Sequence, residues 1–453
     1  MESHPDWPIQ PVALVQEAQE EIPSPPEPAP DETVLTLTDA IRLAFDANPD
    51  LTSSVEQIAE ADAALARARA EFYPRLGISE QYGVTNNPVT AFMFQLNQAQ
   101  LSLMQDFNNP PTTDNFQTQI RLQQSVYAGE RRLHATHAAK AWAAAATMNL
   151  AALQNQMVFR VAEAYYRLLQ ARDLVAVRRE AVEQVRQHLE IVQVRFRNDT
   201  AVKSDVLTVE VRLAEERESL ITAQNQFELA WAVLENVTGA PLVTRALPDA
   251  IPAAPWSEHV DEVEAAVAAA TSQRAEIGAL ASRRQAAADN VLVAEAGKRL
   301  GIDVVGDYDA FTGDFMRGND SFFVGVVFQL NLFDGGRTRS DVARATARVR
   351  ELEARERRLM LDIELDVRRA YLQLQDSEER LKVATQAIGQ ASESLREIEV
   401  RYRGQTATIT QLIDAQVAQS NARVRRATAQ AEVEIARAAL ERAAGRLDAL
   451  ISS

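Results

Sequence analysis

Cysteine is absent from this 453-residue chain, and only 6% of its residues are aromatic. The absence of cysteine excludes disulfides and thiolate metal sites, and it is compatible with a location in the cell envelope. No window of about 18 apolar residues occurs, which excludes a membrane-spanning helix. No basic run occurs either, and 64 acidic against 47 basic residues give a net charge of −17. Because binding a polyanion needs clustered Lys and Arg, we expect no nucleic-acid partner.

Two proline-rich segments divide the chain. Residues 1–34 combine prolines with several acids, which predicts a disordered, extended tail. This tail lacks the basic start and apolar core of a secretion signal. Residues 241–256 contain a second group of prolines and are expected to be a linker. The linker separates two structural repeats, which we expect at residues 35–240 and 257–453.

The evidence for these repeats is a segment, residues 124–239, that occurs twice. Gly129 corresponds to Gly335 and Gly239 to Gly445, a constant offset of 206 positions with no gap. A register kept over this length indicates a duplicated structural unit. The period is longer than that of any solenoid repeat, so we expect each copy to form a large half of one body.

Within each copy, apolar residues recur every seven positions, the spacing of coiled-coil helices. The seam in the first copy contains Val161, Leu168, Val175, Val182, Leu189 and Phe196. A seam of alanines from Ala415 to Ala443 predicts close packing of the last helix against a neighbour. The segment from about Glu130 to Arg197 predicts one helix of ~100 Å at ~1.5 Å per residue. Two shorter helices laid end to end match this length, so each half is expected to pack one continuous helix beside a stack of two.

The shorter helices have recognisable start signals. Thr38 is expected to cap a short helix that ends near Phe45, and Asn48-Pro49 is expected to start a longer helix that ends near Glu71. In the second half, the corresponding helices are expected at residues 257–270 and 273–298.

Four segments instead have the two-residue period of a β-strand. Phe116, Ile120 and Leu122 alternate with polar residues, among them Gln117 and Gln119. The other strands are expected at residues 76–84, 302–310 and 322–332. Each is roughly ten residues long, the length of a tilted strand that crosses a bilayer. Four strands cannot close a membrane barrel, but three chains would supply twelve; the alternative is a soluble sheet that caps a helical bundle.

The order strand, strand, long helix, turn and helix, present twice, resembles that of the TolC-type outer membrane efflux proteins. The resemblance covers about Leu35 to Leu447. Local features that match the family are Asn48-Pro49-Asp50-Leu51, Tyr73-Pro74, Asp334-Gly335-Gly336-Arg337 and Arg401-Tyr402.

This resemblance implies a mainly α fold with a transmembrane β-barrel. A homotrimer would form a 12-strand β-barrel in outer membrane lipid, continuous with a 12-helix α-barrel that extends into the periplasm. Its function would be that of a passive exit duct, with no enzyme activity and no cofactor, for cargo delivered by an inner-membrane pump and a periplasmic adaptor. The cargo itself cannot be read from the sequence. The alternative reading is a soluble coiled-coil scaffold protein without channel activity.

The resemblance also implies sites at the two helix–helix turns. The adaptor would dock at Asp199, Thr200, Ala201, Gln405, Thr406 and Ala407. The family commonly has glycine where Asp199 and Gln405 stand, and Ala407 replaces a gating arginine. Asp414 matches a position that lines the closed tip as a ring of carboxylates, while Gln411 stands where another aspartate would be. Three Asp414 carboxylates could hold a cation in the pore; the alternative is a solvated carboxylate near a helix end.

Other chemistry is sparse. His134 and His137 lie three positions apart, a spacing that can present two ligands to a metal on one helix. No cysteine or third histidine lies near them in the sequence, so we expect surface histidines and no metal site. No pair of carboxylates stands out as catalytic.

Overall fold

The computed structural model describes residues 34–102, 104, 106, 108–242, 244–253, 262–314 and 317–447. The predicted tail lies outside these residues except for Val34, and so do parts of the predicted linker and both ends of the predicted second repeat. None of the described helices combines the length and the apolar character needed to cross a membrane.

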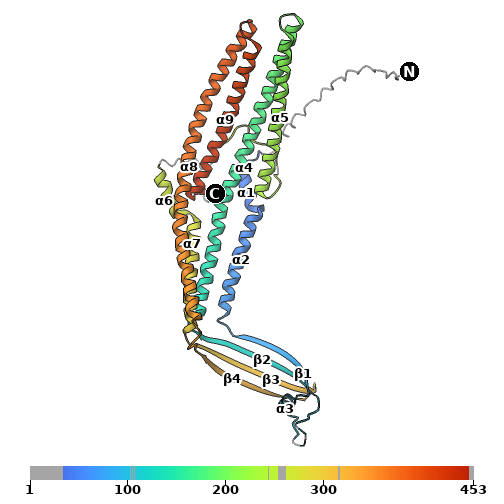
Figure 1. The fold of residues 1–453 in the computed structure, drawn as a ribbon, viewed down its shortest axis with the longest axis vertical. Coiled ribbons are helices and arrows are strands. Elements are labelled where there is room, and N and C mark those ends of the chain that lie inside the picture. Colours follow the sequence, from blue (N-terminus) through green and yellow to red (C-terminus); the bar gives the residue numbers. More distant parts are fainter. Residues whose placement is uncertain are drawn as a thin grey trace, which may run out of the picture.

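Helices build most of the described chain, and four strands form a sheet at one end (Figure 1). The helices are α1 (Leu37–Ala47), α2 (Pro49–Ala70), α3 (Pro88–Asn97), α4 (Arg131–Arg197), α5 (Lys203–Thr238), α6 (Val263–Gln273), α7 (Ala275–Glu295), the 3₁₀ turn η1 (Ala296–Lys298), α8 (Arg337–Arg403) and α9 (Ile409–Ala444). The strands are β1 (Arg75–Thr85), β2 (Thr113–Ala128), β3 (Gly301–Asp314) and β4 (Arg317–Gln329).

The 206-residue register is visible in the boundaries of the long helices. Both α4 and α8 have 67 residues, and both α5 and α9 have 36. Arg131 and Arg337 start the first pair, Lys203 and Ile409 start the second, and each start is offset by 206 positions. The duplication read from the sequence therefore extends to the lengths and ends of these helices.

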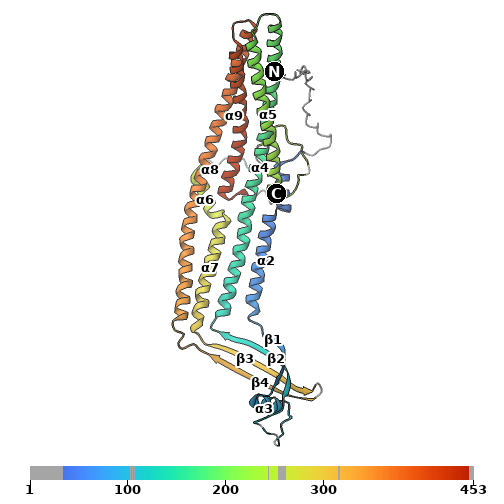
Figure 2. The ribbon, with the colours of Figure 1, turned by 45° about the vertical axis from the view of Figure 1, so that its right-hand side comes forward.

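The long helices run the whole length of the helical body, and shorter helices lie beside them (Figures 1 and 2). Next to the sheet, α2 packs on α4, α4 on α7 and α7 on α8. At the far end, α5 packs on α4, α4 on α9 and α9 on α8. A single layer four helices wide thus runs through the body, with α8 along one edge and α2 followed by α5 along the other. The predicted arrangement of one continuous helix beside a stack of two is confirmed in both halves.

In the first half, the stacked helices α2 and α5 meet end to end at the α1–α2 boundary. The Asn48 side chain accepts the Asp50 N–H at 2.8 Å, which caps α2, and donates to the Val237 carbonyl near the end of α5 at 2.7 Å. Gly239 follows α5 with a left-handed φ of 81°, and a Cβ there would lie 2.8 Å from the Ala47 carbonyl oxygen. Glycine is needed at this position for both its conformation and its small size.

The second half repeats this joint with different chemistry. Gly445 follows α9 with φ 76° and lies against Arg274, which separates α6 from α7. Arg274 and Arg442 both donate to the Asp366 carboxylate of α8 at 3.0 Å. Ion pairs therefore connect the ends of three helices at the middle of the body.

Apolar packing within the layer follows the predicted seam in part, because Val161 and Leu168 are fully buried whereas Phe196 is 42% exposed. Tyr165 and Tyr166 are fully buried in the largest cluster, and the Tyr165 hydroxyl donates to the Leu35 carbonyl at 3.0 Å. Tyr371, the counterpart of Tyr165, packs at the margin of a second cluster. Four members of the alanine seam are buried, namely Ala422, Ala429, Ala436 and Ala443. Small side chains allow the close helix packing that the sequence predicted.

The sheet has the order β1-β2-β3-β4, with every neighbouring pair antiparallel. The β2–β3 pair joins the two halves of the chain. The strand registers place most apolar residues on one face, which includes Leu76, Ile78, Tyr82, Phe116, Ile120, Leu122, Val304, Tyr308, Phe322, Val324, Val326 and Phe328. The predicted alternation is therefore confirmed across all four strands.

The other face of the sheet is mainly polar, and its side chains form hydrogen bonds with one another. Asp309 accepts the amides of Gln117 and Gln119 at 2.9 and 3.0 Å, and the Arg121 guanidinium contacts Asp307 at 2.6 Å. These bonds link strands of different halves. Exceptions to the alternation exist on both faces: Phe323 and Val327 lie on the polar face, and Glu80 lies on the apolar face, where it accepts the Thr118 hydroxyl.

Two local predictions were wrong, and one helix was not predicted. Thr36, not Thr38, caps α1, because its side chain forms a reciprocal capping box with Asp39. The last strand ends at Gln329, so the predicted extension to residue 332 does not belong to it. The long β1–β2 connection contains the unpredicted helix α3, which packs on β2 of its own chain.

Candidate functional site at the two helical tips

The two turns that reverse the long helices lie together at the end of the molecule farthest from the sheet (Figure 1). Asp199 has φ 57° and Gln405 has φ 60°, both in the left-handed region. A side chain other than glycine costs roughly 1 kcal/mol there. Asp199 and Gln405, where the resemblance leads us to expect glycine, are thus the two tip residues that adopt this conformation.

Both turns close with the same hydrogen bonds. The N–H of Thr200 donates to the Arg195 carbonyl at 2.9 Å, and the N–H of Thr406 donates to the Arg401 carbonyl at 2.8 Å. Each threonine hydroxyl also donates to the same carbonyl. These bonds satisfy carbonyl groups that a helix end leaves unpaired, and they fix the shape of the tips.

The predicted docking residues form the outer surface of these turns. Four are exposed and two are half-buried; the exposed four are Asp199, Thr200, Gln405 and Thr406, and the half-buried two are Ala201 and Ala407. Ala407 packs against the cluster described below. The tips therefore present short polar side chains over a backbone held in a fixed conformation.

The predicted gate residues lie in the first turns of α9. Gln411 belongs to a capping box, in which its N–H donates to Thr408 Oγ1 at 3.3 Å and its side-chain oxygen accepts the Thr408 N–H at 3.0 Å. The Gln411 side chain is therefore engaged in holding the start of α9. Asp414, three residues further, lies on the same side of the helix and is exposed.

An interaction between the halves connects the two tips. The Arg195 guanidinium of α4 lies 4.4 Å from the centre of the Tyr402 ring of α8 and donates to the Tyr402 carbonyl at 3.1 Å. Burial raises the pKa of the Tyr402 hydroxyl, and the positive charge of Arg195 opposes this shift. The repeat register aligns Arg195 with Arg401 and Phe196 with Tyr402, but it does not indicate that Arg195 contacts the other half.

A small apolar cluster supports this contact from below. It contains Val185, Val192, Val209, Leu213, Leu395, Tyr402, Ile409 and Leu412, from all four helices of the tips. Near it, His188 is half-buried, and its Nδ1 has no hydrogen-bond partner among the described residues. Burial lowers the pKa of His188, while Glu399 acts in the opposite direction and Arg403 adds to the decrease.

Comparison with known proteins agrees with this architecture. The family described as Outer membrane efflux protein matches residues 40–240 and 266–446. Outer membrane protein TolC of Vibrio cholerae is 24% identical over 382 residues, which are 81% of this chain and 81% of TolC. Alkaline protease secretion protein AprF of Pseudomonas aeruginosa is 25% identical over 331 residues, which are 70% of this chain and 65% of AprF.

A solved structure has the same fold. The outer membrane protein VceC of Vibrio cholerae superposes with a TM-score of 0.75 at 20% sequence identity, covering 90% of this chain and 96% of VceC. The family match extends over both halves and includes both tips and all four described strands. The chain therefore belongs to the outer membrane efflux protein family, whose TolC-type members are transport channels of the outer membrane.

Proposed function

We propose that this chain forms a homotrimeric exit duct of a tripartite efflux or secretion system. The duct passes cargo from the periplasm to the exterior without chemistry of its own. The observation that carries this proposal is the four-stranded sheet, which has an exposed apolar face and whose two edges pair with no other strand in the described part of the chain. Leu76 is 72% exposed on β1, and Phe322 is 80% exposed on β4. An apolar face of this kind is suited to lipid contact.

The open edges of the sheet support closure by further copies. Because neighbouring strands alternate in direction, β4 of one chain can pair with β1 of the next in the antiparallel sense. Three chains then give a closed barrel of twelve strands, an even number as antiparallel closure requires. Closure removes the unpaired backbone groups that make an exposed edge prone to aggregation.

The helical edges carry matching apolar stripes. On α8, Leu361, Leu372 and Val383 recur every eleven residues and are about 60% exposed. On α5, at the opposite edge of the layer, the exposed apolar residues are Leu207, Val211, Ile221, Leu229 and Val233. In a trimer, α8 of one chain would pack on α2 and α5 of the next, which continues the layer into a 12-helix barrel. The same neighbours would then meet along the sheet and along the helices.

The length of the helices supports an extension into the periplasm. A helix of 67 residues spans ~100 Å, so the tips would lie far from the lipid. We place the adaptor contact at the tip residues Asp199, Thr200, Ala201, Gln405, Thr406 and Ala407, with the inner-membrane pump beyond it. We place the cation-binding gate at Asp414, with Gln411 fixing the helix that carries it.

In this proposal the trimer is built from the repeats 35–240 and 257–453, joined by the linker 241–256 and preceded by the tail 1–34. The heptad seams alone also fit a soluble coiled-coil scaffold. Such a scaffold would have no use for an exposed apolar sheet face, which favours the channel.

Detergent extraction followed by mass measurement and recording in planar bilayers tests the proposal. We expect a trimer that forms cation-conducting pores. Leu372→Glu should weaken the trimer, because it places a charge in the apolar stripe of α8. Thr385→Glu is the matched control, since Thr385 is exposed on another side of α8. A water-soluble monomer without conductance would refute the proposal and favour the scaffold.

A further inference from the structure

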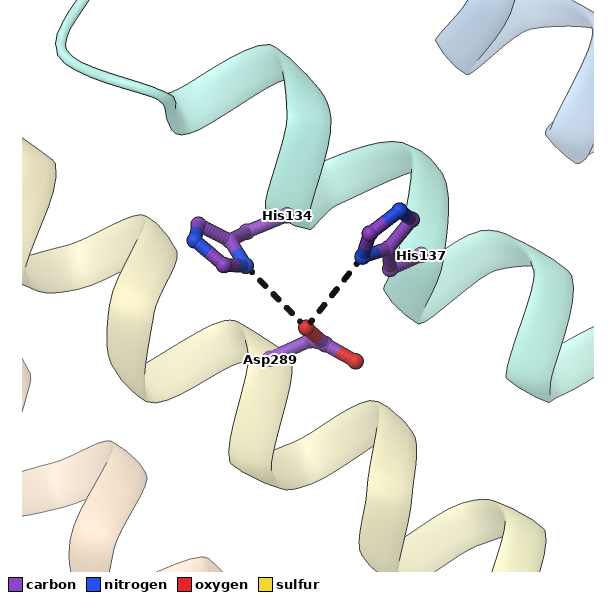
Figure 3. A group of neighbouring side chains, drawn as sticks. All are labelled: His134, His137 and Asp289. Carbon is purple, nitrogen blue, oxygen red and sulfur yellow. Dashed lines mark hydrogen bonds and ion pairs between the residues drawn. The ribbon is translucent and has the colours of Figure 1, made fainter.

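Three potential metal ligands converge between α4 and α7, near the sheet end of the helical body (Figure 3). His134 and His137 project from one side of α4 toward Asp289 on α7. The Nδ1 atoms of His134 and His137 lie 3.1 and 3.9 Å from the same carboxylate oxygen of Asp289. The three ligand atoms all lie within 4.8 Å of one another.

The carboxylate in this group is buried. The Asp289 side chain is only 7% exposed, and its second oxygen accepts the side-chain amide of Gln285 at 3.1 Å. Burying an ionised carboxylate is costly unless a positive charge compensates it. Among the described residues, the only ion-pair partners of Asp289 are the two histidines, which carry charge only when protonated.

We propose that His134, His137 and Asp289 bind a divalent transition-metal ion, for which Zn²⁺ is the reference. Two imidazoles and one carboxylate form a donor set that zinc commonly takes in proteins. With zinc–ligand distances of about 2.0–2.1 Å, neighbouring ligands of a tetrahedral site lie ~3.3 Å apart. The two nitrogen–oxygen distances, 3.1 and 3.9 Å, bracket this value. Small side-chain rotations therefore bring the ligands into place.

The surroundings of the three ligands fit a metal site. Gln285 orients the carboxylate through its second oxygen, the role of the outer hydrogen bonds that support metal ligands. The His137 side chain is 53% exposed, which leaves a path for the ion and room for a water molecule as fourth ligand. A simple ion pair with Asp289 would need one histidine; the second, aimed at the same oxygen, is explained by metal binding.

The site lies within one chain and does not require a neighbour. Next to the sheet, α4 is flanked by α2 and α7 of its own chain, so the α4–α7 contact is internal to the layer. The ion would connect α4 of the first half to α7 of the second half, a few residues from the strands. It would hold the two halves together at that level, beside the β2–β3 pairing of the sheet.

Zinc binding to the full-length, detergent-purified protein tests the site. After removal of metal with EDTA and dialysis, calorimetric titration with ZnCl₂ should show one saturable ion per chain. We expect His137→Gln and Asp289→Asn each to weaken binding at least about tenfold, since losing a direct ligand costs no less than losing an outer partner. His188→Gln, which removes a histidine far along α4, should bind zinc like the parent protein.

Two further measurements separate metal binding from misfolding and from loose surface binding. Co²⁺ should give the visible absorption of a tetrahedral site in the parent protein and not in His137→Gln. Because His137 is half-exposed, this variant should keep the parent's elution volume and circular dichroism spectrum. Absence of saturable zinc binding would overturn the proposal. Equal affinity of His137→Gln, Asp289→Asn and the parent would also overturn it, since zinc would then be held by other acidic groups.

Discussion

Replacing Arg195 with alanine should loosen the tips of the long helices. This side chain would lose its 4.4 Å contact with the Tyr402 ring, its 3.1 Å hydrogen bond to the Tyr402 carbonyl and a longer, 3.5 Å hydrogen bond to the Arg403 carbonyl. A cation–ring contact at a partly exposed site contributes ~1 kcal/mol. A hydrogen bond of this kind contributes about 1 kcal/mol net. The ring contact and the shorter hydrogen bond together contribute ~2 kcal/mol. If neither forms when the two tips are apart, their loss shifts the equilibrium between closed and open tips about 30-fold in each chain.

Single-channel recording in planar bilayers measures this shift directly. We expect Arg195→Ala to increase the open probability or the conductance at low voltage. Hydrogen exchange should also become faster in residues 195–205 and 400–410, a readout that does not depend on the channel proposal. Arg195→Lys should have an intermediate effect, because lysine keeps the charge but loses the planar stacking.

Arg401→Ala is the matched control. Arg401 occupies the corresponding position of the second half, and its side chain is exposed. This variant should conduct and exchange like the parent protein. Parent-like exchange and gating of Arg195→Ala would show that the Arg195–Tyr402 contact does not hold the tips together.

Three further results are expected. Gly239→Ala should reduce the free energy of unfolding by ~2 kcal/mol and so lower the thermal midpoint, because the added Cβ would contact backbone atoms at a left-handed φ. Gly389 lies within α8 with open space around it, so Gly389→Ala should leave the midpoint unchanged or raise it. The pKa of His188 is lowered in the fold, so the unfolded chain binds more protons just below pH ~6.5, and stability should fall as the pH drops through this window. A parent-like decrease in the thermal midpoint of His188→Gln between pH 7.5 and 5.5 would assign the effect to other groups. Asp414→Ala should reduce cation selectivity and block by multivalent cations in bilayer recordings, and unchanged block would remove Asp414 from the gate.

Patterns that repeat along the chain were sufficient to predict the main elements. The register between Arg131 and Arg337 carries over to the ends of four helices, because an ungapped duplication preserves both seams and turns. The alternation in Phe116, Ile120 and Leu122 gave the correct face of the sheet. Helix starts depend on one side chain, and Thr36 and Thr38 are both capable of capping. Thr36 is the cap because Asp39 lies three residues after it and completes a capping box, which it cannot do with Thr38.

Contacts between distant segments could not be predicted in this way. The unpredicted helix α3 is a different case, because it had a local signal: Asn87 caps it and Pro88 starts it, as Asn48 and Pro49 do in α2. By contrast, Asp289 lies 155 positions from His134, and no local pattern indicates that the two side chains meet. The residues predicted at the tips followed from the family resemblance rather than from spacing.

The joints in the middle of the layer have a mechanical consequence. At the level of Asn48 and Arg274, the shorter helices stop and restart, while α4 and α8 continue without a break. Hydrogen bonds and ion pairs hold the shorter helices together at these joints, so movement of the far half can be taken up by gentle bending of the two continuous helices. In the proposed duct, widening at the tips would in this way leave the proposed barrel undisturbed.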